Sequence, residues 1–215
     1  MTKTYLIPEY ARNKIDFIPN PLTSNRFKLE MEFDSHKIDK KLVVILKNPS
    51  ASFQNIDLQN IDYTKPCLDT TTLKVVNFAH KKGYLGIITL NLFPCFDKES
   101  SVVNDRYNLK EGANPKDNPI VENLIEFEEN LKIIKETLSG IDNEKYDLVC
   151  AWGDKSEIVK SYYDSQILEV ISCIKSFGLE LKQVAKDVND KKVILDDTPF
   201  YPLHAQVWGY EYVVC

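Results

Sequence analysis

Histidine is scarce in this 215-residue sequence, and its scarcity argues against a metal centre. The three histidines are His36, His80 and His204, and no two of them are spaced like a pair of metal ligands. The sequence also lacks a P-loop, a G-x-G-x-x-G motif and the Ser, His and Asp order of known hydrolase triads. We therefore expect no metal and no cofactor, and we expect none of these familiar catalytic or phosphate-binding motifs.

Cysteine pairs and long apolar segments are missing as well. The five cysteines are an odd number and form no C-x-x-C motif, and Cys150 and Cys173 have apolar neighbours. This pattern favours buried, reduced thiols in a cytoplasmic protein. The first residues, MTKTYLIPEYARNK, contain no long apolar run, so we expect neither a signal peptide nor a membrane span.

The chain has no excess of positive charge. Its formal net charge is -5 and its pI is about 5.3, so tight non-specific binding to DNA is not expected. A hydrophobic content of 43% and a charged content of 27% are typical of a soluble globular protein. Prolines at positions 8, 19 and 21 predict an irregular N-terminal arm over residues 1–25, followed by a single domain over residues 26–215.

Segments with strand and helix patterns alternate along this domain. Strands are predicted at 26–33, 41–46, 84–93, 146–152, 179–186 and 191–197. Helices are predicted at 70–82, at 120–138 and from Asp154 to about Phe177, and a long loop is predicted at 94–118. This alternation predicts an α/β fold with a central, mainly parallel sheet flanked by helices on both faces.

Polar and aromatic residues follow the predicted strands, at the edge where open parallel sheets bind ligands. The candidate binding residues are Asn48, Pro49, Ser50, Asn91, Phe93, Trp152 and Gly153. Amides can read the donors and acceptors of a planar heterocycle, aromatic rings can stack on it, and a helix beginning after Gly153 could receive a phosphate. Together these groups suit a nucleobase or a nucleotide better than a sugar or an acyl chain.

Each feature also has a structural interpretation. Asn-Pro-Ser after a strand is commonly a turn, and Trp-Gly at a strand end is commonly packing followed by a turn. Asn91 is more unusual, because an amide within an apolar strand needs hydrogen-bonding partners. His204 could be an ordinary loop histidine. The function therefore depends on whether these residues meet at one place.

Six short motifs occur in order along the chain. They are Arg26-Phe27-Lys28-Leu29, Asn48-Pro49-Ser50-Ala51, Asp69-Thr70-Thr71-Thr72, Ala79 with Gly83-Tyr84, Leu90-Asn91-Leu92-Phe93 and Ala151-Trp152-Gly153. In this order they resemble a bacterial and phage family known as the domain of unknown function 1643 family. The resemblance extends from about Arg26 to His204.

The same order is more distantly similar to the uracil-DNA glycosylase superfamily. That resemblance implies that Asn48 positions a water molecule, that Asn91 reads the base and that Phe93 lies near a stacking position. The chain departs from the expected pattern in two places. Tyr201-Pro202-Leu203 stands where the domain of unknown function 1643 family has His-Pro-Leu, and Lys47 replaces the small or apolar residue that normally precedes Asn-Pro.

These departures leave the catalytic machinery open. Asn48 can orient a water molecule but cannot take its proton, as a carboxylate could. Asp69 could supply that carboxylate or could instead cap a helix, and His204 lies three residues beyond Tyr201. The candidate catalytic residues are therefore Asn48, Asp69, Tyr201 and His204.

We expect the protein to recognise a nucleobase-containing small molecule or a single nucleotide of a nucleic acid. This expectation extends to hydrolysis of an N-glycosidic bond. The alternative is a non-catalytic nucleotide-binding or protein-interaction module, such as a phage protein that sequesters a nucleotide or inhibits a host protein. Both hypotheses predict that Asn48, Asn91, Trp152 and Tyr201 lie around one cleft.

Overall fold

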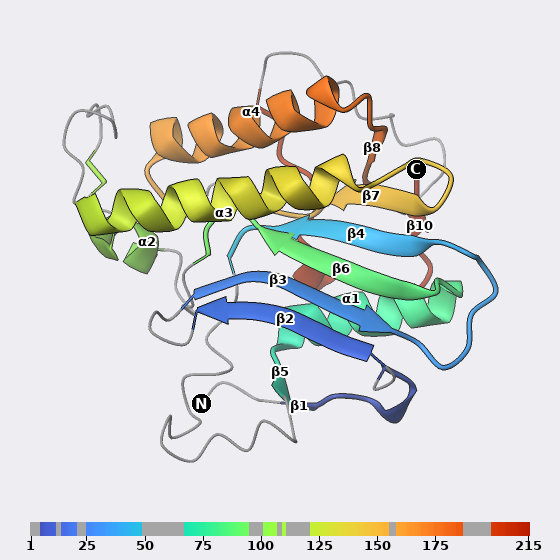
Figure 1. Ribbon diagram of the computed structural model, residues 1–215. Helices are drawn as coiled ribbons and strands as arrows, with labels where there is room; N and C mark the ends of the chain where they lie inside the picture. The colour runs from blue at the N-terminus through green and yellow to red at the C-terminus, as the bar shows by residue number, and fades with distance from the viewer. Residues whose placement is uncertain are drawn as a thin grey trace.

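The computed structural model of the protein is an α/β structure with a mixed six-stranded sheet (Figure 1). The structure describes residues 5–11, 14–20, 25–48, 67–94, 101–106, 109–110, 121–154, 158–186 and 199–215. The strands of the large sheet, in spatial order, are β2 (Lys14–Asn20), β3 (Asn25–Glu32), β6 (Gly86–Asn91), β4 (Lys41–Leu46), β7 (Tyr146–Cys150) and β8 (Leu181–Lys182). The helices in the described residues are α1 (Thr70–Lys82), α2 (Ser101–Arg106), α3 (Val121–Ser139) and α4 (Lys160–Ser176).

Most strands of this sheet run parallel. β6, β4, β7 and β8 form a parallel set, whereas β3 pairs antiparallel with β6 and β2 pairs antiparallel with β3. The predicted α/β class and the mainly parallel sheet are confirmed. Two short antiparallel pairs join β1 (Tyr5–Leu6) to β5 (Cys67–Leu68) and β9 (Val184–Ala185) to β10 (Val213–Val214).

The central strand β4 is buried along most of its length because both of its side-chain rows join the core. Successive side chains of a strand point to opposite faces. Leu42, Val44 and Leu46 pack in one hydrophobic cluster with residues of α1. Val43 and Ile45 pack in a second cluster with residues of α3 and α4. These two helices lie side by side in Figure 1. The apolar run of this strand is the pattern expected for such a position.

The C-terminal segment is held against α1. The short 3-10 helix η3 (Ala205–Val207) contacts α1, and the Trp208 ring lies 5.1 Å from the Phe78 ring, measured between centroids. Trp208 is only 6% exposed, and its Nε1 donates to the Leu203 carbonyl over 3.2 Å. These contacts fix the position of the loop that carries Tyr201 and His204.

Several local predictions differ from the structure. The segment expected to be an irregular arm contains β1, a short 3-10 helix η1 (Glu9–Ala11) and β2 at the edge of the large sheet. The loop expected at 94–118 contains α2, and α4 begins at Lys160 instead of directly after Asp154. The strand expected at 191–197 lies outside the described residues. No helix in the described ranges is long and apolar enough to cross a membrane.

Candidate functional site

The register of the sheet brings the carboxyl ends of β4 and β6 together. Leu46, the last residue of β4, pairs with Asn91, the last residue of β6. The pairing continues past the strands, because the Phe93 amide donates to the Lys47 carbonyl over 2.9 Å. Asn48 and Asn91 therefore lie on neighbouring segments at the edge where parallel sheets bind ligands.

The end of β7 and the C-terminal loop meet at the same edge. The Ala151 amide donates to the Ile45 carbonyl over 2.8 Å, so the chain from Trp152 onward leaves the sheet beside β4. Gly153 has a φ of 71°, and a Cβ atom placed on it would lie 2.9 Å from the Cβ of His204. Only glycine suits this turn, because its left-handed φ and the approach of His204 both disfavour a side chain.

Asn91 is fully buried, and a second buried amide lies beside it. Asn130 of α3 is 1% exposed, and its Nδ2 donates to the carbonyls of Asn91 and Leu92 over 2.9 and 3.2 Å. Asn48 is half-buried. Asn130 was not a predicted site residue. Its only signal in the sequence is a polar side chain among the apolar residues that recur along helix α3.

The two aromatic residues predicted to stack on a base are both fully buried. The Phe93 ring packs parallel to the Tyr163 ring of α4, with 6.0 Å between centroids. The Trp152 ring makes an edge contact with the Phe200 ring, and its Nε1 donates to the Phe200 carbonyl over 3.0 Å. As they are placed here, neither Phe93 nor Trp152 presents a ring face to solvent.

The predicted phosphate-receiving helix does not begin after Gly153. Helix α4 begins at Lys160, its N-cap residue is Val159, and no side chain caps it. This prediction was wrong because Asp154 and Glu157 matched a capping box in sequence, whereas the helical geometry starts later. The carbonyl of Gly153 instead accepts a hydrogen bond of 3.0 Å from the Tyr163 hydroxyl, which also donates to the Trp152 carbonyl.

Tyr201 is the predicted site residue with an accessible aromatic ring. It is 42% exposed, and its ring is nearly parallel to that of Tyr163, with 6.2 Å between centroids. The Tyr201 hydroxyl donates to Asp164 over 2.6 Å, and Lys160 Nζ lies 3.3 Å from the Tyr201 hydroxyl oxygen. Partial burial and the hydrogen bond to Asp164 raise the pKa of Tyr201, so the phenol is protonated at neutral pH.

His204 is held in one orientation at the start of η3. Its Nδ1 accepts a hydrogen bond from the Gln206 amide over 3.3 Å. Burial and then the charge of Lys47 lower the pKa of His204, and the opposing charges of Asp154 and Asp69 offset this only in part. The imidazole is therefore neutral at pH 7, and its proton resides on Nε2 because Nδ1 acts as an acceptor.

Asp69 caps α1. It is 1% exposed, and its two carboxylate oxygens accept hydrogen bonds from the Thr72 amide and the Thr72 hydroxyl over 2.8 and 2.7 Å. Both interpretations of Asp69 were open in the sequence. The geometry is that of an N-cap residue, which satisfies amide groups that the first turn of a helix leaves without partners.

Replacing Asp69 by alanine is expected to lower the free energy of unfolding by about 1–2 kcal/mol, because α1 loses its N-cap. Asp69→Asn keeps an acceptor for the Thr72 amide and should stay within about 0.5 kcal/mol of the unmodified protein. Urea denaturation of both variants checks this. An equal loss in Asp69→Asn would show that the negative charge matters more than the cap.

Lys47 is a further buried polar residue at this edge. Its side chain is 8% exposed, and Nζ lies 3.8 Å from Asp154 Oδ1 and 5.6 Å from the centroid of the Tyr163 ring. The sequence marked it only as a departure from the resemblance. Its burial could not be foreseen, because a lysine after an apolar strand is ordinarily a solvated side chain.

The structure thus brings Asn48, Asn91, Gly153 and His204 to one edge of the sheet, together with Lys47. Tyr201 joins this edge through Tyr163, whose hydroxyl is bonded to Gly153. Pro49 and Ser50 lie outside the described residues, so their binding role stays a prediction.

The family resemblance that the order of the motifs indicated has independent support. A family described as "Protein of unknown function (DUF1643)" matches residues 26–194, which is most of the chain. The chain belongs to the DUF1643 family. No curated protein and no solved structure matches it.

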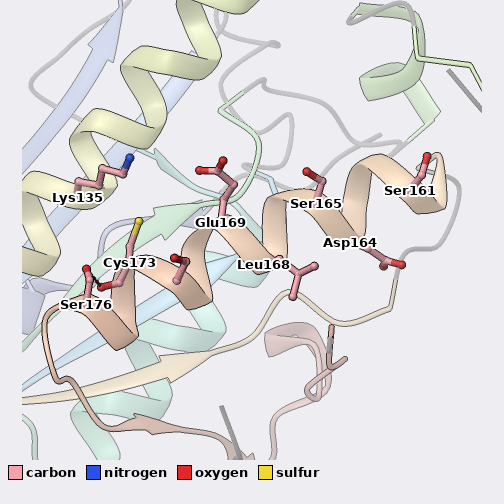
Figure 2. Close-up of a pocket in the computed structure, with 9 residues that line it drawn as sticks. Lys135, Ser161, Asp164, Ser165, Leu168, Glu169, Cys173 and Ser176 are labelled. Atoms are coloured by element: carbon pink, nitrogen blue, oxygen red, sulfur yellow. Dashed lines mark hydrogen bonds between the residues drawn. The ribbon is translucent and has the colours of Figure 1, made fainter. Parts of the chain in front are cut away.

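The surface of this DUF1643 protein also has a groove along α4 (Figure 2). It has a volume of about 660 Å³, and its lining is Lys135, Ser161, Asp164, Ser165, Leu168, Glu169, Ser172, Cys173 and Ser176. None of the predicted site residues lines it. In the part of the chain that the structure describes, no group of three or more His, Cys, Asp or Glu side chains could hold a metal ion.

Cys150 and Cys173 of this DUF1643 protein are free thiols and are buried, as their apolar neighbours predict. Burial raises the pKa of both thiols, and that of Cys150 rises the most because it lies inside the sheet. A thiol with a raised pKa is a poor nucleophile at neutral pH. Neither residue therefore adds a reactive group to the site.

Proposed function

We propose that this DUF1643 protein recognises a nucleobase-containing ligand at the carboxyl edge of its sheet. The ligand is a free base, a nucleotide or a single nucleotide of a nucleic acid. The proposal includes a uracil-DNA-glycosylase-like arrangement, with helices on both faces of the sheet and a site at the ends of its central strands. An acidic chain favours a small ligand over tight, non-specific binding to duplex DNA.

One observation carries this proposal. The register of β4 and β6 pairs Leu46 with Asn91, so the amide of Asn91 and that of Asn48 follow adjacent strand ends. Two amides on rigid, neighbouring strands can present fixed donors and acceptors to the edge of one heterocycle. Open parallel sheets bind their ligands at this edge, where neighbouring strands leave toward different connections.

The described residues suggest a division of roles. Asn48, which is half-buried, would orient the ligand or a water molecule. Asn91 is fully buried, so it would read the base edge after the entering ligand displaces the groups that cover it. Tyr201 is better placed than Phe93 or Trp152 to stack on a base, because it is 42% exposed and they are fully buried. His204 would donate from Nε2 to an acceptor on the ligand.

Binding without turnover is the form of this proposal that the geometry favours. N-glycosidic hydrolysis needs a group that takes a proton from water. Both oxygens of Asp69 already accept hydrogen bonds from Thr72, and Asp69 is 1% exposed. Base release from uracil-containing and damaged single-stranded oligonucleotides, measured beside equilibrium binding, separates a glycosylase from a non-catalytic binding module.

Asn91→Ala is expected to weaken the binding of nucleobases or nucleotides by about tenfold or more, because the removed amide is the reader of the base edge. The melting temperature should fall less in this variant than in Asn130→Ala, in which the Asn91 and Leu92 carbonyls lose a buried donor. Calorimetric titration with the five common bases and their nucleotides, together with melting curves, measures both effects.

Asn130→Ala is the matched control, because it removes a neighbouring buried amide that the proposal does not assign to the ligand. A large drop in melting temperature for Asn91→Ala with unchanged affinity would make Asn91 a structural residue. Absence of binding to every base and nucleotide by the unmodified protein would contradict the proposed function itself.

A further inference from the structure

The outer face of α4, along the groove of Figure 2, is made mainly of short polar side chains. Most of the groove's lining on this helix forms one row, which is Ser161, Ser165, Leu168, Glu169, Ser172 and Ser176. The four serines and Glu169 are exposed, and Leu168 is half-buried. Residues three and four apart share one side of a helix. Because serine is small, the backbone of a second helix can come close to this row.

The positions in this row are symmetric about a midpoint between residues 168 and 169. Ser161 corresponds to Ser176 about this midpoint, and Ser165 corresponds to Ser172. In an interface with two-fold symmetry one patch meets its own copy, so residue i contacts residue j and j contacts i. Two antiparallel copies of α4 that cross at the midpoint would therefore place each serine of the row opposite a serine of the partner.

The neighbouring helix α3 carries a second pattern, which is one of charge. Glu128 and Glu129 form an acidic pair, and Lys132 and Lys135 follow as a basic pair. All four side chains are exposed. Lys132 also lies 3.8 Å from Glu136, in an ion pair whose two side chains are 72% and 64% exposed. Such an exposed pair contributes little and leaves the lysine available to another carboxylate.

The charges of α3 match the same two-fold axis. α3 and α4 pack side by side and run in the same direction in Figure 1. Lys135 lies close enough to Cys173 of α4 for its charge to act on the thiol, and both residues line the groove. The midpoint of the serine row lies about one helical turn before Cys173. On α3 it therefore falls about one turn before Lys135, between the acidic pair and the basic pair. An antiparallel partner would set its acidic pair against the basic pair of this copy, and the reverse.

We propose that α3 and α4 form the interface of a symmetric homodimer, in which the helices of the two copies pack antiparallel across the groove. The partner that fits this face is a second copy of the chain, because the serine row of α4 and the charge pairs of α3 select the same axis. Leu168 and the partner's Leu168 would meet near the axis. Glu169 and the partner's Glu169 would approach each other beside them, and the two Lys135 side chains would offset their charge. This inference does not depend on the proposed function.

Sedimentation of the full chain over a range of concentrations tests the association. We expect a reversible dimer with twice the mass of one chain, since a polar interface of this kind is typical of non-obligate complexes. Ser165→Arg should weaken the dimer about tenfold or more, because it places a long charged side chain between the two helices. Ser35→Arg makes the same change at an exposed serine between β3 and β4 and should leave the association unchanged. Melting curves establish that both variants are folded.

An exchange of charge tests the register on α3. The double variant Glu128→Lys/Glu129→Lys makes all four positions basic, and Lys132→Glu/Lys135→Glu makes all four acidic. Each double variant alone is expected to remain a monomer, because like charges then face each other. An equimolar mixture of the two should form a mixed dimer, and added salt should weaken it.

Engineered cysteines test the register on α4. Residues 161 and 176 are about 22 Å apart along the helix, so only the antiparallel pairing brings one next to the other. A mixture of Ser161→Cys and Ser176→Cys copies should give a disulfide-linked dimer on mild oxidation. Neither variant alone should cross-link more than the unmodified protein, whose own cysteines set the background.

Each result supports or overturns the interface. The mass of a single chain at every concentration, up to several hundred micromolar, overturns the homodimer. A dimer that Ser165→Arg leaves unchanged overturns this face as the interface. Cross-linking of Ser161→Cys with itself, or charge-exchanged variants that fail to associate when mixed, overturns the antiparallel register.

Discussion

Replacing Gly86 by alanine is expected to lower the free energy of unfolding by about 3 kcal/mol or more, the upper end for overpacked sites. A Cβ atom on Gly86 would lie 2.2 Å from the Met31 carbonyl oxygen, which belongs to the backbone of β3 and cannot turn away. Gly86 pairs with Glu32 on one side and with Lys41 on the other. Glycine is therefore needed where two backbones approach this closely.

The side chains around Gly86 use the space that glycine leaves. Lys41 Nζ lies 2.6 Å from Glu32 Oε1 and 2.7 Å from Glu30 Oε1, so two ion pairs join β4 to β3 across β6, beside Gly86. Alanine would disturb both these ion pairs and the pairing of β3 with β6. Chemical denaturation followed by circular dichroism measures the loss.

Gly140→Ala is the matched control for this substitution. The nearest atom to a Cβ on Gly140 lies at 3.6 Å, an ordinary contact distance. This variant should change stability by less than about 1 kcal/mol. Similar losses in Gly86→Ala and Gly140→Ala would contradict the close approach of β3 and β6.

Replacing Asp147 by alanine is expected to cost about 2–4 kcal/mol, because it breaks a largely buried charge network. Asp147 is 9% exposed and accepts hydrogen bonds from Tyr84 over 2.7 Å, from Lys182 over 2.8 Å and from Lys40 over 3.3 Å. Its removal leaves the Tyr84 hydroxyl without an acceptor in a buried place. Glu129→Ala, at an exposed carboxylate of α3, should cost less than about 0.5 kcal/mol.

The same network makes stability depend on pH. Burial disfavours the charged form of Asp147, but hydrogen bonds from Lys182 and Tyr84 and the charges of Lys182 and Lys40 outweigh it and lower the pKa. A carboxyl whose folded-state pKa is lowered stabilises the protein above its unfolded pKa of about 3.9 and loses this contribution as pH falls through the folded value.

Unfolding measured between about pH 5 and pH 2 should therefore show a steeper fall in stability for the unmodified protein than for Asp147→Asn. Glu30 also has a lowered pKa and contributes to the slope in both proteins, so the difference between the two curves reports on Asp147. Parallel curves would mean that Asp147 titrates alike in the folded and unfolded states.

Local patterns in the sequence were sufficient to predict much of the fold. The run Lys41–Leu46 is β4, residues 70–82 are α1, and the alternation of Phe27, Leu29 and Met31 is a buried row of β3. Each of these signals depends on residues close together in the chain, whose period matches a strand or a helix. The polar residues that follow these strands come to one edge of the sheet, because parallel strands end on the same side.

Elements without such local signals were missed. Residues Lys14–Asn20 contain Pro19 and no clear alternation, yet they form β2 because β3 offers an open edge for pairing. Helix α4 was predicted to begin at Asp154, because a capping pattern is recognised from residue types alone. Its beginning at Lys160 is set by the packing of Tyr162 and Tyr163 against the core.

The sequence by itself determined the α/β class, the mainly parallel sheet and the order in which polar residues reach one edge, because periodicity and strand ends are local properties of the chain. Only the tertiary structure decided which of those residues are buried. Phe93 and Trp152 became core residues, Asp69 became a helix cap, and Lys47 became a buried charge beside His204. Burial depends on contacts between segments that are distant in the chain. Phe93 packs against Tyr163, and Lys47 lies beside Asp154.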